Sequence, residues 1–423
     1  MLSRILYYYF NALYLEKKLK SIKQLQAHQQ KKLAALAKKH LVHSPFYKPY
    51  VDIPFNKWPI INKSIMMHHF DDINTVQIQK ERAFEVALKA EQTRDFAPMI
   101  DKYAVGLSSG TSGNRGLFIT SPKERDAWAG MILAKAMPNG ICSKERIAFF
   151  LRANNQLYST LNKSKTIQFH FFDLVTDFEA HIKKLNEIKP TIISAPASVL
   201  IYLARNKHKL FINPKKIISV AEVLESHEAE ILSEVFNCIV SQIYQCTEGL
   251  LAISDRASNT LLMNESFLII EKEWLDETRF VPIITDLFRH SQPVIRYRLD
   301  DVLVENRGST HIYTELKQIE GRLGDVCYGR RGDEIVPVFA DSIRHVIASS
   351  GVDFEDYIIS QNTLGEFSIQ ISPENEDSAR IINHLNQFFI NQKCEVPEWI
   401  LLPYRKPDAA LKRRRIRSCF KPY

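Results

Sequence analysis

Nine consecutive residues in the first third of the chain combine glycine with hydroxyl side chains: Ser108-Ser109-Gly110-Thr111-Ser112-Gly113-Asn114-Arg115-Gly116. Glycine permits positive φ and a close approach of the backbone to a ligand. Consecutive backbone N–H groups in such a turn form a concave anion site, and hydroxyl groups add donors to phosphate oxygens. The stretch therefore predicts a phosphate-holding loop, although no Gly-Lys-Ser/Thr ends it as in a Walker loop. A polar surface loop without a ligand is the alternative that this composition leaves open.

Two further polar stretches each follow an expected strand: Ala221-Glu222-Val223-Leu224 and Tyr244-Gln245-Cys246-Thr247-Glu248-Gly249. In open α/β sheets, ligands lie at the carboxyl ends of the strands. A carboxylate such as Glu248 that faces a phosphate loop there is a natural magnesium ligand, because hard cations take oxygen donors. A helix N-cap or a surface acid is the simpler alternative for Glu248.

Charged residues dominate three later stretches. Residues 285–289 and 293–301 contain Arg296-Tyr297-Arg298 followed by Asp300-Asp301, and an acid at a strand end can accept both ribose hydroxyls. The alternative is a set of salt bridges between these arginines and aspartates. Gly321-Arg322-Leu323-Gly324-Asp325 places an arginine beside a flexible joint, and Leu411-Lys412-Arg413-Arg414-Arg415-Ile416 is a cationic run, a kind of sequence that is usually solvated.

Alternating strands and helices are predicted to position these residues. A helix is expected over residues 15–40 from its apolar spacing, and Pro45 ends it. Beyond it, strands are expected at 103–107, 147–151, 167–172, 191–193, 216–220 and 238–243, with helices at 177–188, from Pro196, and at 226–236. Strands separated by helices of about a dozen residues indicate βαβ units with parallel pairing. Residues 250–313 are richer in strands.

A break at Gly321–Gly324 predicts two domains, at residues 1–321 and 322–423. The second contains expected strands at 335–338, 357–360 and 367–371, a helix near 378–389 and the basic end. The predicted fold is α/β: a large N-terminal domain of mixed, mostly parallel sheets with helices, and a small, hinged C-terminal α+β domain.

The composition is that of a globular cytoplasmic protein. Apolar residues make up 45% and charged residues 25% of the 423 residues. No apolar run reaches the ~18 residues of a membrane helix, and a signal peptide is not expected. The six cysteines are scattered without a C-x-x-C pair, which favours free thiols over a zinc site. Residues 1–48 carry a net charge of +9 and residues 405–421 one of +7, so the rest carries −8.

The order of these stretches resembles the adenylate-forming superfamily, in particular the branch of phenylacetate–CoA ligases, capsule-biosynthesis adenylating proteins and deazaflavin-nucleotide synthetases. The glycine loop and Tyr-x-x-Thr-Glu are the specific parts. Ser44-Pro45-Phe46-Tyr47 and Pro59…Lys63 resemble the N-terminal signature of that branch. The resemblance extends from about residue 25 to residue 416.

The resemblance implies a role for each matching residue. Residues 108–113 (Ser108, Ser109, Gly110, Thr111, Ser112 and Gly113) would hold the β- and γ-phosphates of ATP. Glu222 would lie beside adenine, and Tyr244 near adenine and the acid. Thr247 would contact the α-phosphate, and Glu248 would bind Mg²⁺. In the later motifs, Asp301 would bind ribose, Arg322 ribose and phosphate, and Lys412 would neutralise charge during adenylation.

Three positions depart from the family pattern. Asn114 stands where the family loop often has Lys, and Arg115 supplies a cation with a different reach. Gly324 occupies the position of the hinge acid, with Asp325 one residue later. Lys412 follows Leu411 where glycine is usual.

The implied activity is ATP-dependent adenylation of a small carboxylic acid, aromatic or planar, to an acyl-AMP, followed by transfer to CoA or another acceptor. One alternative is transfer to an amine, and another is non-acyl nucleotidyl transfer. An alternative of another class is a degenerate nucleotide-binding protein that acts through its basic ends on a membrane or nucleic acid. For the enzyme, no nucleic-acid partner is expected, while peripheral membrane contact through the basic ends stays open.

Overall fold

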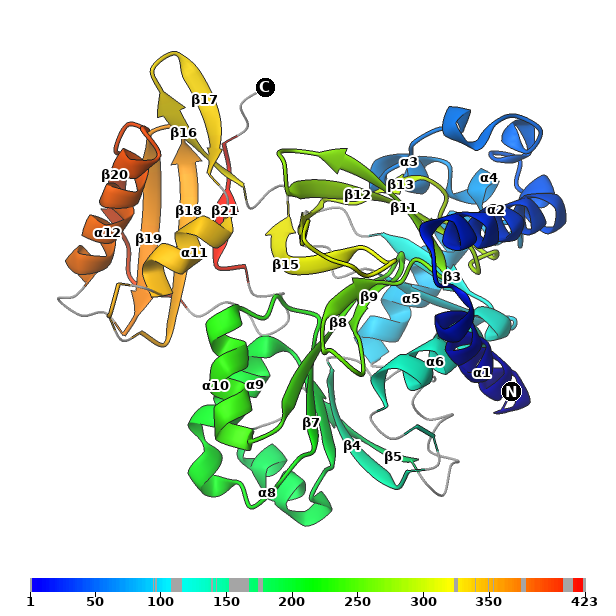
Figure 1. Ribbon diagram of the computed structural model, residues 1–423, viewed down its shortest axis with the longest axis horizontal. Helices are drawn as coiled ribbons and strands as arrows, with labels where there is room; N and C mark the ends of the chain where they lie inside the picture. The colour runs from blue at the N-terminus through cyan, green and yellow to red at the C-terminus, as the bar shows by residue number, and fades with distance from the viewer. Residues whose placement is uncertain are drawn as a thin grey trace. The chain divides into compact units, whose positions relative to one another are not determined.

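The computed structural model describes residues 2–93, 95, 97–107, 116–137, 140–141, 143–151, 167–173, 178–322, 326–338, 340–348, 350–352, 354–373, 378–405 and 414–420. The chain divides into two compact units (Figure 1). The first comprises Met1–Thr278, Pro282–Leu299 and Glu305–Lys317, and the second Arg279–Val281, Asp300–Val304 and Gln318–Tyr423.

Five parallel strands form the centre of the first unit, and they belong to a twelve-stranded mixed sheet. Their spatial order is β5 (Ile167–Asp173), β4 (Glu145–Leu151), β6 (Ile192–Ala195), β7 (Lys216–Val220) and β8 (Ile239–Cys246). The connecting helices are α8 (Phe178–Ile188), α9 (Ala197–Arg205) and α10 (Ser226–Phe236). All four pairings are parallel, which confirms the βαβ units predicted from the alternating pattern.

Both faces of these strands are covered, as a parallel sheet requires. Ile193 and Ile217 join Phe150 in a core with α8, α9 and α10 on one face (Figure 1). Ile192 and Ile218 point to the opposite face, because side chains alternate along a strand. There they pack with α6 (Pro122–Ala136) and α1 (Leu2–Lys18).

The N-terminal region contains two helices where one was predicted over residues 15–40. They are α1, which begins at Leu2, and α2 (Ile22–Lys39). The chain breaks at Leu19–Ser21 because Ser21 adopts an extended conformation and its hydroxyl accepts a hydrogen bond from the Gln24 N–H at 3.3 Å. This is an N-cap, which starts a new helix. The predicted bounds were therefore wrong at both the start and the break.

The remaining strands between residues 99 and 322 are mostly antiparallel, and residues 279–281, 300–304 and 318–322 among them belong to the second unit. A three-stranded sheet of β1 (Met99–Ile100), β2 (Tyr103–Leu107) and β3 (Leu117–Thr120) packs on α5 (Lys80–Thr93). Short helices α3 (Lys63–His68) and α4 (Phe70–Ile73) precede it. The strand-rich region predicted at 250–313 contains β9 (Gly249–Ser254), β10 (Leu261–Met263), β11 (Leu268–Trp274), β12 (Arg279–Asp286), β13 (Tyr297–Arg298) and β14 (Asp301–Glu305). Strand β15 (Glu315–Arg322) runs through Gly321, where the sequence predicted a break.

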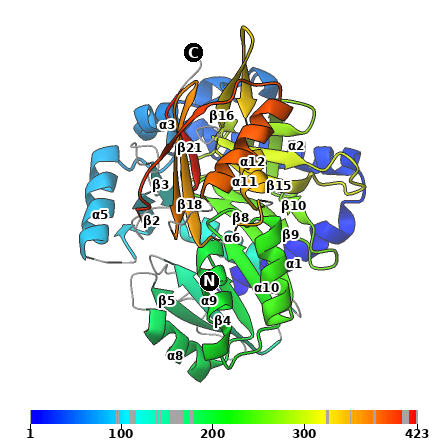
Figure 2. The same ribbon diagram turned by 90° about the vertical axis from the view of Figure 1, so that its left-hand side faces the viewer.

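The second unit is built around a four-stranded sheet in the order β20 (Glu398–Leu401), β19 (Glu366–Ser372), β18 (Asp356–Thr363) and β21 (Ile416–Ser418). Helices α11 (Ala340–Ala348) and α12 (Ser378–Asn391) lie on one face of it (Figure 2). The hairpin of β16 (Cys327–Arg331) and β17 (Glu334–Val338) completes the unit. A large mixed α/β part and a smaller α+β part confirm the predicted fold class.

Two negative findings concern the described part of the chain. None of its helices is both long and apolar enough to cross a membrane. Its five cysteines, 238, 246, 327, 394 and 419, form no disulfide, and Cys142 lies outside the described residues.

Candidate active site

A cleft in the first unit brings together segments that are far apart in the sequence. Its lining includes Lys63 at the start of α3, Gly116 before β3, and Thr247 and Glu248 in the turn between β8 and β9. The segment after β12 adds Arg289, Gln292, Val294 and Tyr297. Gly116 is the last residue of the glycine-rich stretch, so one end of that stretch lies at the Thr247–Glu248 turn. Residues 108–115, on which the phosphate-loop prediction rests, lie outside the described residues.

The Glu248 carboxylate is held by a hydrogen bond on each oxygen. The Thr247 hydroxyl donates to Oε2 at 2.9 Å, and the Tyr297 hydroxyl donates to Oε1 at 3.1 Å. Tyr297 is buried, which fixes the position of its hydroxyl group. Each carboxylate oxygen has further lone pairs, so these bonds orient Glu248 and leave it able to accept from a ligand.

Arg289 holds the Thr247–Glu248 turn in place through hydrogen bonds. Its side chain is 7% exposed, and its guanidinium donates to the Thr247 carbonyl, to Gln292 Oε1 at 3.2 Å and to the Ile119 carbonyl at 3.5 Å. A planar guanidinium suits several fixed acceptors at once. Arg289 therefore connects the Thr247–Glu248 turn to β3, the strand that follows the glycine-rich stretch.

Gln292 makes the second connection to β3. Its Oε1 accepts from the Ile119 N–H at 2.9 Å, and its Nε2 donates to the Leu117 carbonyl at 3.1 Å, so the side chain pairs with the strand as a neighbouring backbone would. Gln292 is 2% exposed, and a buried amide that makes these bonds is costly to displace. The end of the glycine-rich stretch is thus fixed relative to Glu248.

Two acids hold the segment that carries Arg289 and Gln292. Asp286 Oδ1 accepts from the N–H groups of Phe288 and Arg289 at 2.8 and 3.0 Å, and burial raises the pKa of Asp286 to about 6. Glu124 accepts from the Ser291 N–H and hydroxyl, both at 2.7 Å. Burial alone would raise the pKa of Glu124, but His290 and these hydrogen bonds outweigh it and lower that pKa.

Glu222 and Tyr244, predicted near adenine, do not line this cleft as the described residues define it. Glu222 follows Ala221, which has a left-handed φ of 66°, and its Oε2 accepts from the Ser198 N–H at 2.9 Å. Its carboxylate thus caps the N-terminus of α9, where negative charge is favourable. Tyr244 is half-buried on β8, beside a β-bulge at Tyr244/Gln245.

The other predicted site residues lie in the second unit or beyond the described residues. Asp301 is the first residue of β14, within the second unit. Arg322 ends β15, and its side chain is not described. Lys412 lies outside the described residues.

Arg296 and Arg298 form salt bridges with two glutamates. Arg296 pairs with Glu271 at 2.7 Å, and Arg298 with Glu273 at 2.7 Å, both on β11. Salt bridges, the alternative that the sequence left open for this stretch, are thus present for both arginines, with partners on β11.

The N-terminal signature has both a packing role and a place in the cleft. Tyr47 is fully buried beside Ile295, and the Ser44 hydroxyl donates to the Asp72 carbonyl at 2.8 Å. Lys63, the last residue of the signature, lines the cleft. Sequence reasoning did not assign Lys63, Arg289 or Tyr297 to the site, although each falls within a stretch that it singled out; Gln292 carries no sequence signal of its own.

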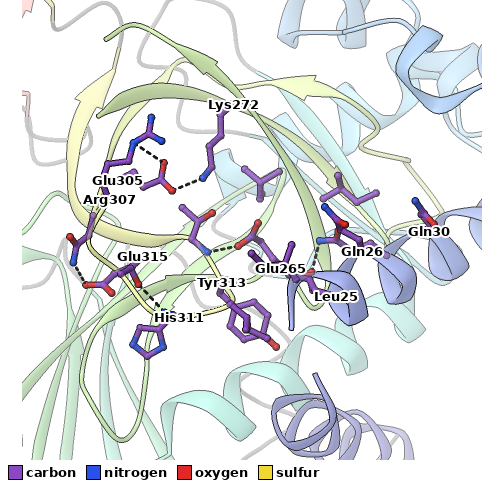
Figure 3. A pocket seen from close by; sticks show the side chains of 18 of the residues that line it. Leu25, Gln26, Gln30, Glu265, Lys272, Glu305, Arg307, His311, Tyr313 and Glu315 are labelled. Carbon is purple, nitrogen blue, oxygen red and sulfur yellow. Dashed lines mark hydrogen bonds and ion pairs between the residues drawn. The ribbon is translucent and has the colours of Figure 1, made fainter. Parts of the chain in front are cut away.

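A larger cavity of about 720 Å³ lies elsewhere in the first unit, between α2, β11 and residues 305–315 (Figure 3). Lys272 and Glu305 point toward each other in it and form an ion pair of 2.8 Å. Glu265 also lines it, and burial raises the pKa of that carboxyl. None of the predicted site residues lines this cavity, so its size does not make it the candidate active site.

No protein-family model matches the chain. Over 158 residues the chain is 27% identical to protein CapK of Staphylococcus aureus, and the match covers 36% of this chain and 35% of CapK, about a third of that protein's length. In contrast to this partial sequence match, similarity of fold to solved structures extends over most of the chain.

Three solved structures illustrate that likeness. One is a 2-hydroxyisobutyryl-CoA ligase in the postadenylation state with R3-HIB-AMP, with a TM-score of 0.63, 15% identity, and coverage of 95% of this chain and 90% of that one. The acyl acid amido synthetase AtGH3.15 in complex with 2,4-DB gives a TM-score of 0.61 at 11% identity, with coverage of 97% and 94%. The amide bond synthetase McbA from Marinactinospora thermotolerans gives 0.54 at 10% identity, with coverage of 73% and 67%. The chain therefore has the fold of adenylate-forming enzymes, as its motifs predicted.

Proposed function

We propose that this protein is an adenylate-forming ligase, which activates a carboxylic acid with ATP. The observation that carries the proposal is the cleft in which Gly116, Thr247 and Glu248 meet. These residues belong to the two most specific motifs of the sequence, and they converge although they lie on separate elements. The fold, shared with acid–CoA ligases and amide synthetases, agrees with this chemistry.

The reaction explains why the cleft needs these groups. The substrate carboxylate attacks the α-phosphorus of ATP, an acyl–AMP anhydride forms, and the bond to pyrophosphate breaks. Negative charge builds on the phosphate oxygens. We assign its stabilisation to the backbone N–H groups of residues 108–113 and to the Thr247 hydroxyl, which would exchange its hydrogen bond to Glu248 for one to the phosphate. We assign Lys412 to the same charge and Arg322 to ribose and phosphate. Positioning the carboxylate against phosphorus supplies much of the remaining rate enhancement.

Magnesium fits the residues of the cleft. Among the described residues no group of three or more His, Cys, Asp or Glu side chains could hold a metal ion by itself. Mg²⁺ commonly binds through one or two carboxylates together with substrate phosphates and water, which suits the single, oriented Glu248 carboxylate. When bound with ATP, the ion would neutralise phosphate charge.

Nucleotide selection involves the remaining predicted residues. We assign Glu222 and Tyr244 to the surroundings of adenine and Asp301 to the ribose hydroxyls. For Glu222, this role requires that the carboxylate oxygen not bonded to Ser198, or the backbone of the turn, faces the nucleotide. We further propose that residues 322–423 form a mobile domain that alternates between adenylation and transfer.

The acid and the acceptor define two versions of this function. We favour an aromatic or planar acid and transfer of the acyl group to CoA. Transfer to an amine is the second candidate, because amide-forming enzymes are among the proteins of similar fold. Offering CoA and amino acids in parallel, with mass spectrometry of the products, separates the two.

Acid-dependent ATP–pyrophosphate exchange tests the adenylation step across aromatic, indolic and fatty acids. We expect exchange with one class of acid, and a loss of at least 100-fold in Glu248→Gln and in Lys412→Ala. Glu273→Gln and Lys393→Ala are matched controls at positions outside the cleft, and they should retain activity. Absence of exchange with every acid, in a protein that binds ATP, would overturn the proposal.

A further inference from the structure

Helix α1 presents a stripe of large apolar side chains to solvent. Tyr7, Phe10 and Tyr14 are 62%, 59% and 56% exposed, and Leu2 is 65% exposed. Positions 7, 10 and 14 are three and four residues apart, so they share one face of the helix. We call Tyr7, Phe10 and Tyr14 the aromatic stripe, and Leu2 is exposed at the start of the same helix. Several large apolar groups gathered on one exposed face usually mark an interaction site.

The stripe is displayed by a helix that is firmly attached to the first unit. On the other face of α1, Ile5, Tyr9, Ala12 and Leu15 are buried in the core that includes α6. A Cβ placed on Gly130 of α6 would lie 2.6 Å from the Ile5 carbonyl oxygen, so the two backbones are in direct contact. Figure 1 shows α1 lying along α6. The stripe is therefore a fixed surface and not part of a flexible tail.

Lysines extend the stripe toward the C-terminal end of α1. Lys17, Lys18, Lys20 and Lys23 are all exposed, and Lys18 Nζ lies 5.3 Å from the centre of the Tyr14 ring. The one acid among the first 48 residues, Glu16, turns away from this face toward Lys135 and Arg256, at 3.8 and 3.5 Å. The exposed face of α1 thus combines apolar rings with the ammonium groups of Lys17 and Lys18, and Lys20 and Lys23 follow shortly after the helix.

We propose that the aromatic stripe and its lysines dock the protein on an anionic membrane surface. An amphipathic helix with aromatic and aliphatic side chains beside lysines lies in the interface, with the rings among the acyl chains and the ammonium groups among lipid phosphates. Helix α1 has 17 residues and is not a spanning helix, so the contact is peripheral. The docking goes beyond the adenylation reaction and places that reaction at a lipid surface.

Charge and side-chain type favour lipid over other occupants. A second copy of the same face would bring lysines against lysines, which is unfavourable. Single-stranded nucleic acid stacks on aromatic rings, but the exposed Leu2, and Ile22 at the start of α2, offer no stacking surface. Aliphatic side chains do stabilise binding to a membrane, because they become buried among the acyl chains of the lipid.

Vesicle co-sedimentation of the full-length protein tests the proposal. We expect at least tenfold tighter binding to vesicles of 30% phosphatidylglycerol in phosphatidylcholine than to phosphatidylcholine alone, and a marked loss between 0.1 and 0.5 M NaCl. The triple variant Tyr7→Ser/Phe10→Ser/Tyr14→Ser should bind at least tenfold more weakly, as should Lys17→Gln/Lys18→Gln/Lys20→Gln. Phe211→Ser is the matched control, because Phe211 is 76% exposed and lies outside α1.

Circular dichroism checks that each variant is folded. We expect wild-type spectra, because the substituted side chains are exposed. Equal binding to both kinds of vesicle, or none, would overturn the proposal. Two other results would also overturn the proposal, provided that the aromatic triple variant abolishes them. One is a dimer in light scattering, and the other is binding to single-stranded RNA in place of vesicles.

Discussion

Replacing Arg289 with methionine tests whether the cleft is held together as described. The guanidinium is buried and bonds to three acceptors: the carbonyls of Thr247 and Ile119, and Gln292 Oε1. A hydrogen bond to a charged group contributes about 1.5–3 kcal/mol, and such bonds within one network are not additive. Methionine fills most of the volume and removes the cost of burying a charge. We therefore expect the free energy of unfolding to fall by about 2–4 kcal/mol.

The matched control for this substitution is Arg298→Met. Arg298 forms a two-bonded pair with Glu273 at 2.8 and 2.7 Å, but both side chains are partly exposed. Exposed ion pairs contribute about 0–1 kcal/mol, so urea denaturation should show a smaller loss than in Arg289→Met. Exchange activity should also fall about 100-fold in Arg289→Met alone, because a displacement of about 1 Å at the Thr247–Glu248 turn is costly. Equal losses of stability in the two variants would refute the reasoning.

Substitutions at three further positions test the surroundings of the cleft and the packing of α1. The folded-state pKa of Asp286, about 6, lies above the ordinary value of 3.8 for an aspartate, so protonation of this carboxyl favours folding below pH 4 and this contribution is lost as pH rises through 6. Urea denaturation should therefore show that wild type loses about 2 kcal/mol relative to Asp286→Asn between pH 4 and 7; parallel pH profiles would contradict this. Tyr47→Ala should cost about 3–5 kcal/mol in the same assay and Tyr47→Phe less than about 1, because the ring is fully buried while the hydroxyl bond is long at 3.4 Å. Gly130→Leu should separate α1 from α6 and speed tryptic cleavage after Lys17 and Lys18, and cleavage at the wild-type rate would show that the helices are not in contact.

The sequence predicted the parallel core well because its elements have clear local patterns. Strand β7 and helix α10 have the predicted bounds, since apolar runs and amphipathic spacing are visible without the rest of the fold. Helix α6 was missed because it is buried on nearly every side, including Gly130 and Lys135, and so shows no polar face. Whether a helix is buried on every side depends on residues that are distant in the sequence, and a short stretch of sequence does not contain them.

The candidate site was predictable only in part. Tyr-x-x-Thr-Glu marked Thr247 and Glu248, because their spacing is specific. The supports could not be predicted: Gln292 acts through hydrogen bonds to β3, and that distant strand is known only from the fold. Likewise the bond from Ser198 to Glu222 depends on where α9 begins relative to β7.

The pairing of β21 with β18 changes how the C-terminal basic run should be understood. Strand β20 ends at Leu401, and from Ile416 the chain is again part of the same sheet, where β21 pairs in parallel with β18. Arg415 is fixed there by Asp356 at 3.1 Å. The C-terminal end of the basic run is therefore part of the folded sheet, so Arg415 and Ile416 lose their conformational entropy on folding and not on binding a ligand.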